Sequence, residues 1–404
     1  MIGRRAWMSM VLGCLLWGSV VIESSWNGRV WGDEPSTGPG SAQVAGHSTD
    51  AKVDGEAAAP ATPLESAILP VHPQRSPRLI RLRGELRRCL DYYYRQRYDL
   101  ARYTPWDVMH MLIAYGVDTQ VRYNGRDVNA IGWLCWNQPC RGQRLLRVID
   151  GRVYGTVGVG VEGHEAQFLA MLAQSRVPKD FEIRAYGRRF TVADLVESEK
   201  RTCRAGTELT FKLIGLSHYL PSDAEWTATS GETWSIPRLI REELAQPISG
   251  SACGGTHRMM GFAYAVYKRQ RRGEPITGEW KRAATYVRDY HEYMFKLQNP
   301  NGSFSTNWFR GRGDSGDIDR YVQTTGHMLE FLLFSLPEDQ LDDERVVKSV
   351  EFLTRLLWRH RDRSWHIGSR GHALHALAIY DQRMFGAKPG ERTQAQVARK
   401  SASN

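Results

Sequence analysis

The sequence lacks the features that would assign it at once to a known kind of site or binding module. It has no Cys-X-X-Cys pair and no tight grouping of cysteine and histidine of the kind that marks structural zinc sites. It also lacks the combination of basic and aromatic residues typical of nucleic-acid-binding modules, so no nucleic-acid partner is expected. After the N-terminal region, no segment is apolar over enough residues to span a bilayer.

Cysteine is scarce, and its number is odd once Cys14 is set aside. The remaining five are Cys89, Cys135, Cys140, Cys203 and Cys253. At least one thiol must therefore stay unpaired within the chain. Cys203 and Cys253 precede two successive apolar runs at similar distances, which predicts a disulfide between them, and Cys135 with Cys140 is the local alternative.

Positive charge exceeds negative charge. The chain has 54 Lys and Arg against 44 Asp and Glu, for a formal net charge of +10. This balance favours an anionic partner such as an acidic polysaccharide or lipid headgroups, although a solvated basic surface would give the same numbers. With 42% hydrophobic residues, the chain can still bury a substantial core.

The N-terminus has the pattern of a targeting segment. Arg4 and Arg5 precede an apolar run over residues 6–22, so we expect residues 1–32 to be a signal peptide or an uncleaved signal anchor. The protein would then be exported, to the periplasm or the cell exterior, or held at the membrane by this segment. Residues 33–77 are rich in small and polar residues and predict a disordered linker. The folded domain is expected over residues 78–386, followed by a disordered tail over residues 387–404.

One pattern recurs along the predicted domain: a small residue, then His or Glu, then an apolar helical run. It is clearest over residues 251–266, and the markers of the six copies are His110, His164, Glu208, His257, His327 and His372. Each apolar run follows an amphipathic, charged helix, which suits an inner helix covered by an outer one. The repeat predicts an all-α fold, an (α/α)6 toroid of six outer and six inner helices with small β-hairpin insertions.

Three stretches resemble the repeat of the terpenoid cyclase and protein prenyltransferase class of α/α toroids. That repeat has an aromatic and an aliphatic residue, then Gln, Gly and Trp, and residues 293–304 match it with Gln298, Gly302 and Phe304. Degenerate copies begin at Trp133, with Gln138 and Gly142, and at Phe352, ending at Trp365 without the Gln. The resemblance implies a toroid with a central cavity that accepts an isoprenoid or a similar ligand.

The chain departs from the catalytic motifs of this class. Asp317-Ile318-Asp319-Arg320 matches only half of the Asp-rich acid motif of the class II cyclases. Cys253-Gly254-Gly255-Thr256 lacks the Gln of the thioester-containing toroids, and the zinc-binding pattern of the prenyltransferases is not reproduced. The fold is thus better supported than any particular activity.

Closure of the six pairs would bring the repeat markers to one rim, near the helix N-termini. The partial positive charge there attracts anions and lowers histidine pKa values, which favours neutral imidazoles. Such residues could bind a divalent metal, or one His and one carboxylate could act as base and acid. The predicted catalytic residues are His257, His327, Asp317, Asp319 and Glu208, and the predicted ligand-binding residues are His164, His372, Arg310, Arg312, Trp308, Tyr321 and Trp365. Packing at a repeated position would explain the same recurrence.

These features predict an exported, terpenoid-cyclase-like toroid that binds or processes a cell-envelope ligand, either an isoprenoid or an anionic molecule. One alternative is a polysaccharide lyase or glycosidase that acts on an acidic glycan. Another is a non-catalytic scaffold of the envelope. A wide groove lined by Trp and Arg would favour the glycan, a deep apolar cavity the isoprenoid, and a cavity packed shut the scaffold.

Overall fold

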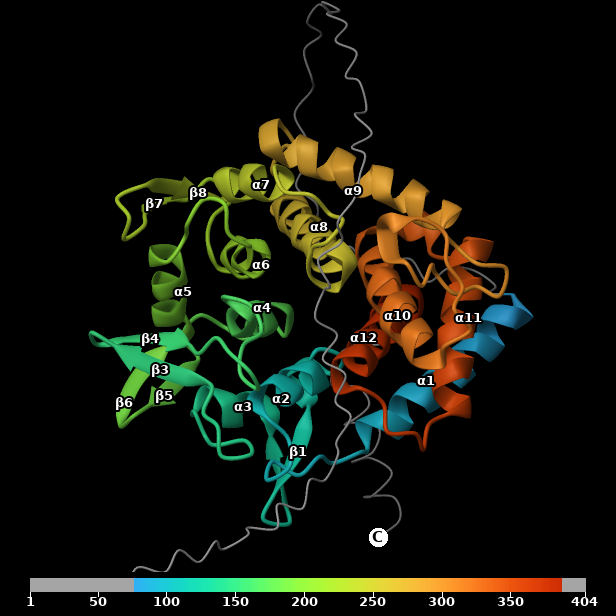
Figure 1. The fold of residues 1–404 in the computed structure, drawn as a ribbon, viewed down its shortest axis with the longest axis horizontal. Helices are drawn as coiled ribbons and strands as arrows, with labels where there is room; N and C mark the ends of the chain where they lie inside the picture. Colours follow the sequence, from blue (N-terminus) through green and yellow to red (C-terminus); the bar gives the residue numbers. More distant parts are fainter. Residues whose placement is uncertain (1–75, 387–404) are drawn as a thin grey trace, which may run out of the picture. The chain divides into compact units, whose positions relative to one another are not determined.

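The computed structural model describes residues 76–386, which belong to one compact unit of the chain (Figure 1). Within these residues there are twelve α-helices and four two-stranded antiparallel hairpins, so a mostly α-helical fold with small hairpin insertions is confirmed. The predicted signal segment and tail, and nearly all of the predicted linker, lie outside the described residues. Within the described part of the chain, no helix has both the length and the hydropathy needed to cross a membrane.

The helices alternate along the chain between two packing environments. They are α1 (Pro77–Tyr94), α2 (Pro105–Leu112), α3 (Ala130–Cys135), α4 (Gln167–Gln174), α5 (Val192–Arg201), α6 (Thr210–Tyr219), α7 (Ile236–Leu244), α8 (Thr256–Arg271), α9 (Gly278–Lys296), α10 (Ile318–Ser335), α11 (Glu344–Arg359) and α12 (Ile367–Phe385). Each even-numbered helix packs against the next even-numbered one, and α12 packs back against α2. The odd-numbered helices pack against these and lie at the periphery in Figure 1.

Three of the four hairpins form where a residue with positive φ precedes glycine. The four hairpins pair β1 (Gln120–Tyr123) with β2 (Arg126–Asn129), β3 (Leu146–Ile149) with β4 (Arg152–Gly155), β5 (Glu182–Ala185) with β6 (Arg188–Thr191), and β7 (Glu225–Thr227) with β8 (Thr233–Ser235). Asn124-Gly125, Asp150-Gly151 and Tyr186-Gly187 all have φ between 47° and 77°, as two-residue hairpin turns require. The sequence around Tyr186-Gly187 predicts a hairpin over residues 181–190, and the structure confirms it. The apolar residues of 127–137 predict a helix, which is wrong in its first part, because the Asn124-Gly125 turn makes residues 126–129 a strand.

Side-chain caps set where several helices begin. Thr104 and Asp107 form a reciprocal capping box around Pro105 at the start of α2, as the Thr-Pro signal predicted. Thr191 and Asp194 form a second capping box at the start of α5. These bonds satisfy backbone N–H groups that have no acceptor within their own helix.

The Gln-Gly motif that carries the family resemblance ties α9 to α11. The Gln298 side chain donates to the Arg345 carbonyl at 2.8 Å and to the Ser349 hydroxyl at 2.7 Å, both near the start of α11. Gly302 has a φ of +96°, and a Cβ there would lie 2.6 Å from the Lys348 carbonyl oxygen. The motif therefore joins the end of one peripheral helix to the beginning of the next through contacts that a larger residue at position 302 would block.

Neither predicted disulfide forms. Cys135, Cys140 and Cys203 are buried free thiols in the described part of the chain, so both expected pairings were wrong. Burial raises the pKa of the Cys203 thiol to about 11 and that of the Cys140 thiol to about 12. Thiols that stay protonated and enclosed in the core act as small apolar residues.

A buried carboxyl group supports the start of α4. Glu162 is 1% exposed, and its Oε1 accepts from the Phe168 amide at 2.6 Å. Burial raises the pKa of Glu162 to about 8, and the nearby Glu199 carboxylate acts in the same direction. The folded protein therefore holds a proton on Glu162 at pH values at which the unfolded chain has lost it.

Replacing Glu162 with Gln should weaken the pH dependence of stability. A group whose pKa is raised in the folded state stabilises the protein fully at pH values below its unfolded pKa. This stabilisation is lost as the pH rises through the folded pKa. The free energy of unfolding of the wild type should therefore fall between about pH 4.5 and pH 8, by up to ~1.4 kcal/mol per pH unit. The E162Q variant keeps an acceptor for Phe168 and cannot ionise. Urea unfolding at several pH values measures the difference, and parallel profiles for the two proteins would contradict it.

Candidate metal centre

Three residues with left-handed backbone conformation form a turn directly before α8. Cys253, Gly254 and Gly255 have φ values of 48°, 64° and 89°. A Cβ on Gly254 would lie 2.2 Å from Trp308 Cγ, and one on Gly255 would lie 2.3 Å from Ile248 Cγ2. Only glycine fits both the backbone angles and the space. The turn places Cys253 beside the first turn of α8, which carries His257.

Five histidines from five helices or their leading loops gather at His257. Ring centroids of His164, His327 and His372 lie 5.4, 5.6 and 5.3 Å from that of His257. The His327 and His372 rings stack at 3.8 Å, and His110 lies 5.5 Å from His372. The structure thus brings together all five histidines among the predicted repeat markers.

Two Gly-His pairs act differently from the prediction. Gly326-His327 and Gly371-His372 lie in the interiors of α10 and α12, so the expected position of these two histidines at helix N-termini was wrong. The glycines instead let helices approach closely: a Cβ on Gly326 would lie 2.9 Å from Ala373, and one on Gly371 would lie 2.3 Å from the His110 carbonyl oxygen. Close approach of these backbones allows the imidazoles to stack.

Hydrogen bonds at Nδ1 fix the orientation of the surrounding rings. His110 Nδ1 lies 2.8 Å from the Trp106 carbonyl oxygen, and His327 Nδ1 lies 2.7 Å from the Gln323 carbonyl oxygen. A carbonyl oxygen only accepts, so Nδ1 carries the hydrogen in both rings. In a neutral ring, Nε2 then keeps its lone pair, which is how most metal-binding histidines are held.

Carboxylates orient two further rings. His372 Nδ1 lies 2.7 Å from one oxygen of Glu330, whose other oxygen is 2.5 Å from His375 Nδ1. Burial alone would raise the pKa of Glu330, but the two histidines hold it well below its usual range. His164 Nδ1 pairs with Glu208 at 2.6 Å. Glu208 thus supports a histidine, and its predicted place within a first helical turn was wrong, because α6 begins at Thr210.

His257 is the exception, because neither of its ring nitrogens has a partner. The residue is 8% exposed, and both nitrogens are shielded from solvent without a hydrogen bond. Burial, followed by the neighbouring histidines, lowers the pKa of His257 well below its usual value, and burial does the same for His327. For His110 the pKa is lowered to about 3. These three rings are therefore neutral at physiological pH, and His257 bears the desolvation cost of a polar group that has no hydrogen bond among the described residues.

Cys253, His257 and His327 offer a ready set of metal ligands. One potential ligand atom from each of the three lies within 4.8 Å of the other two. A tetrahedral ion with bonds of about 2.0–2.3 Å would hold its ligands roughly 3.3–3.8 Å apart, so small side-chain movements would complete the site. Cys253 lies four residues before His257, and this spacing is a sequence signal for a shared site rather than for the predicted disulfide.

The other predicted site residues have different positions. Trp308 reaches the cluster, with its ring nearly perpendicular to that of His327 and the two ring centroids 5.6 Å apart. Asp317 caps α10, Asp319 pairs with Arg363, and Arg312 donates to the Lys296 carbonyl. The Tyr321 hydroxyl bonds Asp314, Trp365 Nε1 donates to the Tyr93 hydroxyl, and Arg310 is exposed. Among the described residues, none of these six side chains makes a contact with a histidine of the cluster.

Comparison with known proteins adds no second source of evidence: no protein-family model matches the chain, and no curated protein matches it. The chemistry of the cluster is therefore argued from its geometry.

Substitution of Gly254 by Ala should cost more stability than the same change at Gly250. Both glycines have positive φ, so alanine costs about 1–2 kcal/mol at either position. At Gly254 the new Cβ also meets the Trp308 ring, which adds about 1–3 kcal/mol, whereas at Gly250 nothing lies within 4 Å. Urea unfolding of G254A and G250A measures the difference. Equal losses would mean that Trp308 moves freely.

Proposed function

We propose that the chain is a metal-binding (α/α)6 toroid whose ion is held by Cys253, His257 and His327. The toroid is supported by the even-numbered helices, which pack in a series that returns from α12 to α2, and by the odd-numbered helices packed around them. The metal site is supported above all by His257, whose two buried nitrogens have no hydrogen-bond partner among residues 76–386. A metal ion would give one of them a ligand bond.

The donor atoms select the class of ion. Imidazole nitrogen with thiolate sulfur suits Zn²⁺ and the borderline or soft transition metals, whereas Mg²⁺ and Ca²⁺ prefer oxygen ligands. His372, His164 and His110 surround the three proposed ligands and supply the fourth position or hold a bound molecule beside it. The carboxylates of Glu330 and Glu208 would not bind the ion themselves; each forms a hydrogen bond that orients a histidine near it, His372 and His164 respectively.

The activity that we propose is binding or processing of a cell-envelope ligand, isoprenoid or anionic, at this centre of an exported protein. The resemblance of residues 293–304 to the cyclase repeat and the targeting pattern of residues 1–32 support this assignment. A bound transition metal would polarise an oxygen of the ligand or activate water. The acid role predicted for Asp317 and Asp319 is replaced in this proposal by the metal, because both residues are engaged outside the cluster.

Metal uptake by the wild-type chain tests the proposal. We expect the purified full-length protein, stripped with a chelator, to take up one equivalent of Zn²⁺ or Co²⁺, measured by elemental analysis and native mass spectrometry. Co²⁺ should give a near-ultraviolet thiolate charge-transfer band that the C253S variant lacks. A protein that takes up none of the transition-metal ions offered would contradict the metal site.

The H257L variant separates a ligand from a packing residue. Removing two unpaired buried nitrogens should raise the stability of the metal-free protein by about 1–3 kcal/mol. The same change should abolish the stabilisation by metal, which for the wild type is about 2.7 kcal/mol at an ion concentration one hundred times the Kd. His218 on α6, which pairs with the Tyr264 hydroxyl, provides the control H218L. If both variants bind metal like the wild type, His257 is only a packing residue.

A further inference from the structure

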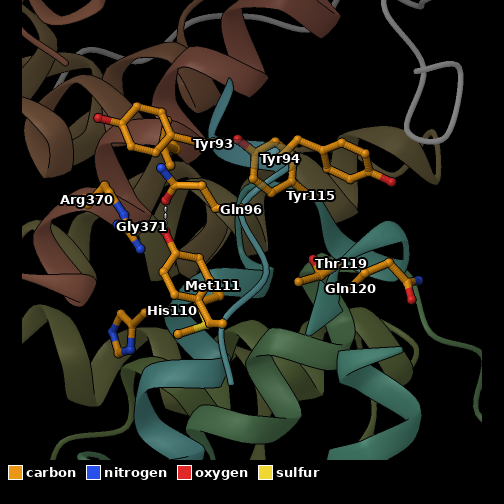
Figure 2. A pocket seen from close by; sticks show the side chains of 12 residues that line it. Tyr93, Tyr94, Gln96, His110, Met111, Tyr115, Thr119, Gln120, Arg370 and Gly371 are labelled. Carbon is orange, nitrogen blue, oxygen red and sulfur yellow. Dashed lines mark hydrogen bonds between the residues drawn. The ribbon is translucent and has the colours of Figure 1, made fainter. Parts of the chain in front are cut away.

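A small pocket lies beside the histidine cluster, between the end of α1, the end of α2 and the first turns of α12. Aromatic side chains of Tyr93, Tyr98 and Tyr115 line it, together with His110 and Arg370 (Figure 2). In this view Arg370 and His110 lie on the same side of the pocket, opposite Tyr115. His110 also contacts His372, so one residue lines the pocket and belongs to the cluster.

Arg370 is a buried cation without a carboxylate partner. Three arginines in the described residues are buried: Arg258, Arg269 and Arg370. Arg258 pairs with Glu243 at 2.9 Å, and Arg269 pairs with Asp223 at 2.9 Å and with the Pro275 carbonyl. Arg370 is 7% exposed, yet within residues 76–386 no acidic oxygen lies within 4.0 Å of its guanidinium. The fold compensates the other two charges and leaves this one open to a ligand.

The surroundings of Arg370 compensate its charge only in part. Its guanidinium lies over the rings of Tyr98 and Tyr93, 4.8 and 5.6 Å from their centroids, and hydrogen-bonds the Tyr98 hydroxyl. Ring faces attract a cation weakly compared with the desolvation cost of a buried charge, which is several kcal/mol. An anion in the pocket would add an ion pair to the bond from Tyr98, and no carboxylate among residues 76–386 forms one with Arg370.

The size of the pocket limits that anion. Its free volume is about 30 Å³, roughly the space of two water molecules. A planar carboxylate fits such a space and matches the forked guanidinium, whereas a sugar ring or an isoprenoid chain does not. A tetrahedral phosphate can also accept two bonds from a guanidinium, but it is larger than a carboxylate and exceeds this space.

We propose that this pocket is a carboxylate-binding site in which Arg370 holds the anion. Tyr98 flanks the bound group, and the apolar tyrosine walls exclude water from the ion pair. We further assign this carboxylate to the ligand of the neighbouring metal centre, because His110 belongs to both places. This second step rests on the proposed function, whereas binding at Arg370 does not.

Acetate and formate are the probes for the full-length protein. At constant ionic strength set with chloride, the unfolding midpoint of the wild type should rise with probe concentration as expected for a ligand of the native state. The R370Q variant should weaken the apparent affinity at least tenfold, and R370K, which keeps the charge without the fork, should give an intermediate loss. The matched control is R282Q, an exposed arginine on α9 that pairs with Glu279, and it should respond like the wild type.

A second measurement separates binding from a structural role of Arg370. Without a carboxylate, R370Q should be as stable as the wild type or more stable, because an unpaired buried charge is removed. A large loss of stability, a midpoint equally sensitive to acetate in R370Q and wild type, or a response to phosphate but not to carboxylates would each overturn the proposal.

The H257L variant distinguishes this inference from the proposed metal site. Acetate binding that persists in H257L and disappears in R370Q supports the pocket, whether or not the protein binds metal. Acetate binding that disappears in metal-free H257L and persists in R370Q would assign the anion to the histidine cluster and overturn the role of Arg370.

Discussion

The centre of this fold depends on imidazoles that stay neutral while buried against one another. The rings of His110, His327 and His372 are each oriented by a hydrogen bond at Nδ1. For His110 and His327 the acceptor is a carbonyl of the same helix, and for His372 it is Glu330 from the adjacent helix. Protonation of one ring would place its charge among the others in a desolvated space. The cluster therefore disfavours a proton and leaves lone pairs for a cation that several rings can share.

Helix packing and ring geometry are linked through small residues. Gly326 and Gly371 bring α10, α12 and α2 into close approach, and the following residue in each case is a histidine of the cluster. Gly254 likewise allows a close approach, in this case between its own backbone and the Trp308 ring. The interior is consequently built around short helix-to-helix distances, and the rings fill the space between the helices. Larger residues at these positions would separate the histidines.

Local chemistry made much of the fold predictable, and long-range contacts limited the prediction of the site. Thr104-Pro105 and Tyr186-Gly187 act within a few residues, so their cap and turn could be read from the sequence. The histidines were found because they recur. The roles of Cys253, Glu330 and Arg370 depend on which helices become neighbours, which no spacing along the chain reveals. Asp317 and Asp319 were placed in the site from a partial motif, and the length of the preceding loop instead puts them on a cap and an exposed ion pair.

The order of the elements along the chain has a consequence for biosynthesis. α12 contributes His372, packs against both α10 and α2, and is the last helix of the described residues. A growing chain that has reached α11 therefore lacks His372, which pairs with Glu330, and also lacks the helix that packs against α2. The five-histidine cluster is therefore complete only after α12 has been synthesised, although Cys253, His257 and His327 all precede this helix in the chain.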